Sequence, residues 1–181
     1  MAANRAVDDY AINICGIPGA TLMKNAGIAV VAEMEQHGYL HDTPKILILA
    51  GHGNNGGDGF VIAQELVEKG FTVDLICAAE ESSLKGDALV HFEKLKLMGF
   101  GCQVWQNSLE QNDLILKADL IVDALLGTGI TGEIRSPYNA IIHSCNASRA
   151  TVVAVDVPSG LTGDLGEILN PCIKADLTVS M

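Results

Sequence analysis

The chain has 181 residues, which suits one domain with a sizeable core, and its 22 acidic against 11 basic residues give a formal net charge of −11 at pH 7. A surface of this sign repels phosphate backbones, so we expect no nucleic-acid partner. Hydrophobic residues make up 49% of the chain but aromatic residues only 4%, which predicts an aliphatic core. Such a core is typical of a parallel sheet covered by helices on both faces.

Cysteine usage and the chain's N-terminus predict the compartment. The five cysteines are Cys15, Cys77, Cys102, Cys145 and Cys172. Their odd number, without a CxxC pair or a metal-binding spacing, predicts reduced and mostly buried thiols. The N-terminus has no apolar run of the signal-peptide type, and no stretch reaches the length of a membrane span. We therefore expect a cytoplasmic protein with no membrane partner.

Helical and strand patterns alternate along the chain. Apolar residues at helical spacing predict helices over about residues 6–14 and from about residue 23 to the His37–Gly38 stop. The predicted strands cover residues 45–50, 72–77, 103–105, 120–126, 151–155 and 177–181. The predicted helices between them cover residues 60–69, 82–98, a weakly patterned segment ending at residue 116, and residues 137–146. This order predicts one Rossmann-like domain, a doubly wound and mainly parallel sheet in a three-layer α/β/α arrangement.

Ligands bind beyond the carboxyl ends of the strands in such sheets, and three unusual segments follow predicted strands. The first segment, residues 51–59 (GHGNNGGDG), includes a GxGxxG match, which is a weak signal alone. It also holds two asparagines and Asp58. Glycines allow close approach to a ligand, and asparagine side chains both donate and accept hydrogen bonds. The alternative is a tight turn in which Asp58 only caps the next helix.

The second and third segments each place an aspartate at a strand end. In the second, residues 123–133, Asp123 precedes glycines and threonines whose amides can hold phosphate. Nearby Arg135 either adds positive charge to this loop or forms a surface ion pair. In the third, residues 155–160, Asp156 either faces the crevice or organises a turn. Because all three segments would converge on one crevice, we favour the functional interpretation.

Six pieces of the sequence occur together in a characteristic order: Asp8 and residues 16–19 (GIPG), 22–27 (LMKNAG), 54–59 (NNGGDG), 123–127 (DALLG) and 156–161 (DVPSGL). Taken together, they resemble the NAD(P)H-hydrate epimerase family, which repairs hydrated NADH and NADPH. The resemblance extends through most of the chain, and its specificity lies in the combination. One departure is Lys24, where the family commonly has glutamate.

The resemblance implies an isomerase that interconverts the R and S forms of the hydrated cofactor at C6 of its nicotinamide ring. It implies Asp156 as the catalytic acid or base. It implies a potassium ion on Asn55, Asp123 and Ser159, whose oxygen atoms suit a hard cation. The implied substrate-binding residues are Asn54, Asn55, Gly56, Gly57, Asp58, Gly127, Thr128, Gly129, Ile130, Thr131, Gly132, Glu133 and Asp156.

Two other classes of protein stay open. One is a non-catalytic binding or dimerisation module of the same fold, although such a module has no need of converging polar strand ends. The other is an ordinary NAD(P)-dependent Rossmann oxidoreductase, which the GxGxxG match alone supports. Asp58 weakens that interpretation, because a carboxylate beside a pyrophosphate repels it.

The resemblance also implies protein partners, namely a homodimer and a C-terminal, ADP- or ATP-dependent dehydratase domain or separate dehydratase. The last predicted strand stops at Met181 and leaves an unpaired outer edge. We therefore expect that residues 1–181 form a single domain that lacks its C-terminal elements, and that a longer natural chain covers this edge.

Overall fold

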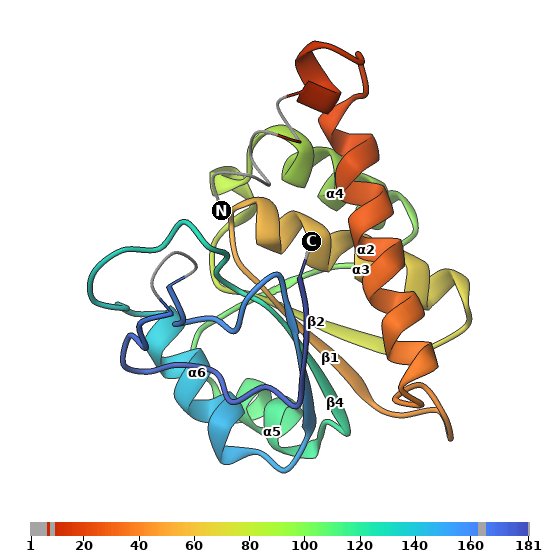
Figure 1. Ribbon diagram of the computed structural model, residues 1–181. Helices are drawn as coiled ribbons and strands as arrows, with labels where there is room; N and C mark the ends of the chain where they lie inside the picture. The colour runs from red at the N-terminus through yellow and green to blue at the C-terminus, as the bar shows by residue number, and fades with distance from the viewer. Residues whose placement is uncertain (1–6, 8–9, 163–165, 181) are drawn as a thin grey trace.

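The computed structural model describes residue 7 and residues 10–162 and 166–180. These residues form a six-stranded sheet in the order β3-β2-β1-β4-β5-β6, and all neighbouring strands pair in parallel (Figure 1). The strands are β1 (Ile46–Ala50), β2 (Val73–Cys77), β3 (Gln103–Val104), β4 (Leu120–Ala124), β5 (Thr151–Val155) and β6 (Leu177–Val179). The predicted parallel sheet is confirmed, while Met181 of the last predicted strand lies outside the described residues.

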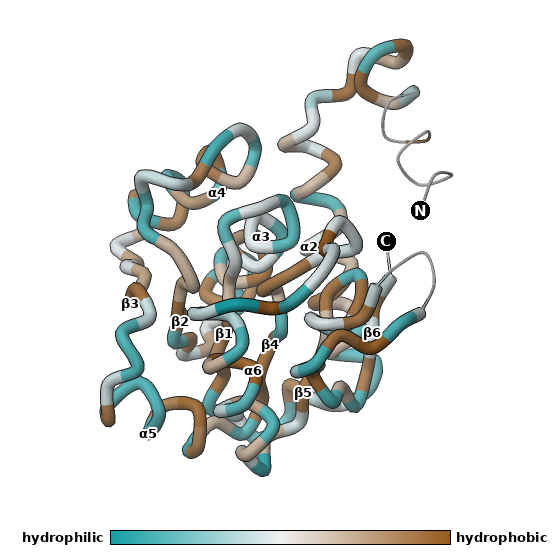
Figure 2. Tube along the Cα trace, turned by 90° about the vertical axis from the view of Figure 1, so that its left-hand side faces the viewer, coloured by the Kyte–Doolittle hydropathy of each residue, from teal (hydrophilic) through white to brown (hydrophobic). Residues whose placement is uncertain are grey.

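Helices cover both faces of the sheet, which confirms the predicted three layers. One face packs against α2 (Gly19–Gln36), α3 (Asn54–Glu68) and α4 (Gly86–Leu97), and the other against α5 (Leu109–Lys117) and α6 (Tyr138–Ala147) (Figure 1). Side chains alternate along each strand, so Ile48 joins the first core and Leu49 the second. Figure 2 shows apolar residues gathered in the central strands. Within the described residues, no helix combines the length and apolar character needed to cross a membrane.

The N-terminal segment stands apart from the layers. Residues 10–13 are helical, in agreement with the first predicted helix, of which residues 6, 8 and 9 lie outside the described residues. Residues 10–18 project from the start of α2 (Figures 1 and 2). Tyr10, Ile12 and Ile14 expose 60%, 40% and 69% of their surfaces, so the apolar side chains of this segment remain open to solvent.

The order of the strands has a switch point between β1 and β4. From β1 the chain proceeds outward to β2 and β3, and then returns to β4 on the other side of β1. Connections that leave β1 and β4 therefore run to opposite faces of the sheet. Such a switch point opens a crevice at the carboxyl ends of the strands, where ligands bind in this class of fold. The three segments singled out in the sequence follow β1, β4 and β5, beside this switch point.

Helix α3 begins earlier than the sequence predicts. It starts at Asn54 instead of residue 60, so most of the first segment forms helical turns and not a loop. The sequence suggested a loop because glycine disfavours helix. The glycines are needed for close packing: a Cβ on Gly56 would overlap the carbonyl oxygen of Gly51, and one on Gly57 would lie 2.6 Å from the sulfur of Met23.

Two further predictions are wrong. Neither Ser82 nor Ser83 caps α4, because Ser83 Oγ donates to the carbonyl of Glu80 (2.6 Å) and closes a separate 3₁₀ turn. The helix itself starts at Gly86. Cys77 and Cys102 are joined in a disulfide, so the five thiols are not all reduced. The pairing of β2 with β3 brings the Cα atoms of Cys77 and Cys102 to 6.1 Å, within the range that a disulfide spans.

Candidate functional site

Asp123 links the end of β4 to the third segment. Its side chain is fully buried, and its Oδ1 and Oδ2 accept hydrogen bonds from the Ser159 hydroxyl (2.6 Å) and the Ser159 amide (2.7 Å). The Leu125 amide also donates to Oδ1, at 3.3 Å. Burial raises the pKa of Asp123 to about 6, although the Ser159 bonds lower it. No salt bridge within the described part of the chain compensates this carboxylate.

Asn55 connects the first segment to the same place. Its Nδ2 donates to the Leu126 carbonyl (3.1 Å), and the Leu126 amide donates to Ser159 Oγ (2.9 Å). The Oδ1 of Asn55 is buried and accepts no hydrogen bond from any described residue. A buried amide oxygen without a partner is costly, so it calls for a ligand. Asn55 and Ser159 both bond Leu126, and Ser159 bonds Asp123, so the structure brings these three residues together. Their side-chain oxygen atoms are of the type that suits a hard cation.

Asp156 adopts an unusual backbone conformation. Its φ of 65° lies in the left-handed region, which residues other than glycine seldom enter. The backbone is held there by β6, since the Asp156 amide donates to the Val179 carbonyl (2.8 Å) and Ser180 Oγ donates to the Asp156 carbonyl (3.0 Å). Backbone strain of this kind concentrates at functional sites. The turn therefore fixes the direction in which the half-buried Asp156 side chain leaves the sheet.

Gly127 brings the three segments together. A Cβ on Gly127 would lie 3.5 Å from the Cβ of Asn55 and 3.6 Å from Oδ2 of Asp156. Burial raises the pKa of Asp156, and hydrogen bonds from the amide and hydroxyl of Thr128 lower it. Residues 127–133 are half-buried or exposed, so this loop lies at the surface of the protein. The predicted convergence of the second and third segments with Asn55 is thus present in the structure.

The remaining residues of the first segment differ in exposure. Asn54 is exposed at the start of α3, whereas Gly56, Gly57 and Asp58 are buried. Asp58 lies inside the helix and does not cap it, because the N-cap position is Gly53. Arg135 is exposed and forms no salt bridge within the described residues, so the ion-pair alternative for it is not favoured.

Sequence reasoning missed one contact at this site. The Nδ1 of His52, in the first segment, lies 2.6 Å from the hydroxyl of Tyr138, the first residue of α6. The only sequence signal was a histidine between two glycines. Nothing in the sequence pairs it with a tyrosine 86 residues further on.

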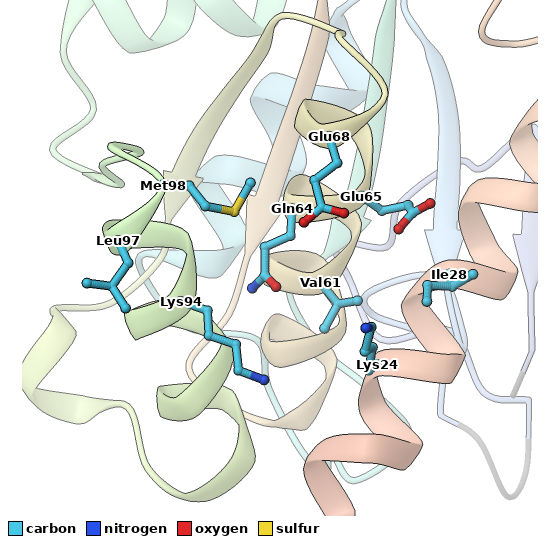
Figure 3. A pocket seen from close by; sticks show the side chains of 9 residues that line it. All are labelled: Lys24, Ile28, Val61, Gln64, Glu65, Glu68, Lys94, Leu97 and Met98. Atoms are coloured by element: carbon cyan, nitrogen blue, oxygen red, sulfur yellow. The ribbon is translucent and has the colours of Figure 1, made fainter.

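A separate hollow of about 360 Å³ lies between α2, α3 and α4 (Figure 3). Lys24, the residue that departs from the family pattern, projects into it beside Lys94 and Gln64. The other lining residues are Ile28, Val61, Glu65, Glu68, Leu97 and Met98. None of these residues belongs to the three segments, so the hollow is not the site assembled at the strand ends.

Comparison with known proteins identifies the family. Residues 19–181 match the family described as YjeF-related protein N-terminus. The NAD(P)H-hydrate epimerase of Rhodopirellula baltica is 36% identical over 97% of this chain and 70% of its own length. The NAD(P)H-hydrate epimerase of Limosilactobacillus fermentum is 37% identical over 99% of this chain and 82% of its own. The chain therefore belongs to the YjeF-related N-terminal family, and the resemblance seen in the sequence is confirmed.

Other relatives are longer than this chain. The bifunctional NAD(P)H-hydrate repair enzyme Nnr of Moorella thermoacetica is 40% identical over 91% of this chain, which spans only 32% of that enzyme. The chain spans 35% of the corresponding enzyme of Salinibacter ruber. The crystal structure of the yeast protein ynu0 superposes with a TM-score of 0.86 at 24% identity, over 99% of this chain and 77% of that one. This last likeness shows the shared fold.

Proposed function

We propose that this chain is an NAD(P)H-hydrate epimerase, which interconverts the R and S forms of hydrated NADH and NADPH at C6 of the nicotinamide ring. The observation that carries the proposal is Asp156, held at a strained φ of 65° with its Oδ2 beside Gly127 at the switch point of the sheet. The epimerases of Rhodopirellula baltica and Limosilactobacillus fermentum support it, since both align with nearly the whole chain.

Asp156 supplies acid–base chemistry in this proposal. Inverting C6 requires either loss and return of its hydroxyl or opening and closing of the ring, and each route moves a proton to the substrate and back. One carboxyl group can give that proton and then recover it. Burial raises the pKa of Asp156, so a larger fraction of its carboxyl groups is protonated at a given pH than in an exposed aspartate.

Backbone amides hold the phosphates in this proposal. With a net charge of −11, the chain has no excess of cationic side chains for the purpose. Residues 127–133 present their amides at the crevice, and the uncapped N-terminus of α3 lies across from them. Asn54, which is exposed there, adds a side chain that can donate and accept. Arg135, which forms no salt bridge with another described residue, favours an anionic ligand at the same loop.

We also propose that Asn55, Asp123 and Ser159 hold a potassium ion. The unpartnered Oδ1 of Asn55 and the fully buried carboxylate of Asp123 support this donor set. When bound, the cation would neutralise Asp123 and fix the three segments relative to one another. Transition metals are a poorer fit, because the described residues contain no cluster of three His, Cys, Asp or Glu side chains.

Three wider proposals follow from the sequence. The chain acts in the cytoplasm, a proposal that rests on the sequence alone, since the Cys77–Cys102 disulfide removes the support that five reduced thiols would give. It forms a homodimer, for which the exposed Tyr10 and Ile14 supply apolar surface. It works with a dehydratase, in the same chain or in a separate one, because several relatives are bifunctional repair enzymes.

The oxidoreductase alternative has little support at this site. Strand β2 ends at Cys77, and the acidic residues that follow it, Glu80 and Glu81, come only after Ala78 and Ala79, beyond the strand end where a dinucleotide ribose is bound. A non-catalytic module would not explain the strained Asp156. A direct test starts from one purified epimer of hydrated NADPH with potassium present. We expect the chain to accelerate its conversion to the epimer mixture, and a rate equal to the spontaneous one would overturn the proposal.

A further inference from the structure

His52 and Tyr138 form a contact that the proposed chemistry does not use. The His52 Nδ1 and the Tyr138 hydroxyl oxygen lie 2.6 Å apart, and the two ring centroids lie 6.3 Å apart with the planes tilted by 55°. The tyrosine hydroxyl can either donate or accept, so the bond can form with either tautomer of the histidine. Burial raises the pKa of Tyr138, so its hydroxyl keeps its proton at neutral pH.

The backbone that carries His52 is fixed on its N-terminal side. The Gly51 amide donates to the Ala124 carbonyl (2.9 Å), and a Cβ on Gly51 would overlap the carbonyl of Leu125. On the other side Gly53 forms the N-cap of α3. His52 is therefore an exposed side chain on a backbone anchored to the sheet, and it can serve as a fixed point for a neighbouring loop.

The neighbouring loop, residues 125–137, contains no helix or strand and connects β4 to α6. Its beginning is tied to the first segment, because Asn55 Nδ2 donates to the Leu126 carbonyl (3.1 Å). Its end leads directly into Tyr138, which contacts His52 of that same segment. The start of α6 has no side-chain cap of its own. The first segment therefore binds both ends of the 125–137 loop, through residues only three positions apart in sequence.

We propose that His52 and Tyr138 are positioning residues, whose hydrogen bond holds the 125–137 loop in the shape that meets the substrate. The inference rests on the proposed function, since the loop carries Thr128 and the amides assigned to substrate. Neither residue touches the reacting atoms in this account. Losing the bond lets the loop sample other conformations, which reduces the fraction of the protein that is ready to bind.

The kinetic test uses Tyr138→Phe, which removes the hydroxyl and keeps the ring. We expect KM to rise roughly three- to tenfold, the size of one hydrogen bond, while kcat changes much less. His52→Ala should behave alike, and the double variant should be no worse than either single one because they share one interaction. His52→Asn, which keeps a polar group near the hydroxyl, should recover part of the loss. Additive effects of the two single variants would overturn the proposal.

A second readout needs no enzyme activity. Arg135 is exposed within the 125–137 loop, so trypsin cleavage after it reports how often the loop opens. Tyr138→Phe should speed this cleavage roughly three- to tenfold relative to cleavage after Lys85, on another element. Tyr10→Phe and His143→Ala, which change exposed residues, serve as matched controls and should leave it unchanged. If the wild-type chain has no epimerase activity, this readout still decides the inference, and unchanged cleavage would reject it.

Discussion

Two aspartates at the ends of neighbouring strands have very different surroundings. Asp123 pairs with Ala154 in the register of β4 and β5, so it still lies within the sheet, fully buried and bonded to Ser159. Asp156 lies two residues beyond Ala154, just past the C-terminal end of β5. It is half-buried and has a positive φ. Position relative to the C-terminal ends of the strands therefore distinguishes an aspartate that is bonded inside the protein from one that stays accessible to a ligand.

The largest expected effect is on the rate when Asp156 is changed to Asn. Asparagine tolerates the left-handed conformation and keeps the size of the side chain, but it cannot exchange a proton in the same way. Epimerisation should slow by ~10²–10⁴-fold, the usual contribution of a general acid or base. Equilibration of a single epimer, followed by chromatography, measures this. Activity within a few-fold of the wild type would remove Asp156 from the catalytic role.

The next largest effect is on stability when Asp123 is changed to Ala. The Ser159 amide and hydroxyl and the Leu125 amide would lose their buried acceptor, which should cost roughly 2–4 kcal/mol in the free energy of unfolding. Urea unfolding measures it. The exposed Asp119, which accepts one bond from the Lys45 amide, is the matched control, and Asp119→Ala should cost less than about 1 kcal/mol. Equal costs at the two positions would contradict the assigned role of Asp123.

Potassium should stabilise the folded chain by a smaller amount. Replacing LiCl by KCl at equal ionic strength should raise the wild-type melting temperature by roughly 2–4 °C, because a ligand of the folded state stabilises it. Asn55→Ala should abolish this difference between the salts, since it removes the unpartnered oxygen. Asn54→Ala, at the exposed neighbouring position, should preserve it. A wild type that responds equally to both salts would argue against the cation site.

The smallest expected effect concerns pH. Burial raises the pKa of Asp156 in the folded state, so the folded chain binds more protons than the unfolded chain between the ordinary and the raised value. The free energy of unfolding therefore falls as pH rises through this window. The Asp156→Asn variant has no carboxyl group to titrate here and keeps this stability. Its melting temperature should therefore rise relative to that of the wild type as pH increases from about 4. Melting curves at several pH values test it, and parallel curves would contradict the raised pKa.

Much of the fold could be predicted from the sequence, because buried parallel strands read as continuous apolar runs. Strand β1 is buried at every position, and the predicted range 45–50 differs from it by a single residue. Asp123 and Asp156 could be placed at the crevice for the same reason, since each follows such a run. The start of α3 could not be predicted, because the packing that requires its glycines involves the turn of the backbone at Gly51 and the distant side chain of Met23.

Contacts between distant segments were also beyond the sequence. The His52–Tyr138 bond and the Cys77–Cys102 disulfide depend on how loops and strands meet in space. The unpartnered oxygen of Asn55 is a property of its surroundings and leaves no mark on residue type or spacing. Asn55 could be proposed as a cation ligand through resemblance alone, and its unpartnered oxygen is an independent observation that supports this proposal.

The most direct test of the account measures rate and stability together in Asp156→Asn and Asp123→Asn. Each variant is assayed for equilibration of a single epimer of hydrated NADPH, with the rate expressed per folded molecule, and for its melting temperature. We expect Asp156→Asn to lose the rate and to keep or raise the melting temperature, while Asp123→Asn should lower the melting temperature. The opposite pattern, with a near-normal rate in Asp156→Asn, would contradict the claim that Asp156, just past the C-terminal end of β5, performs the chemistry.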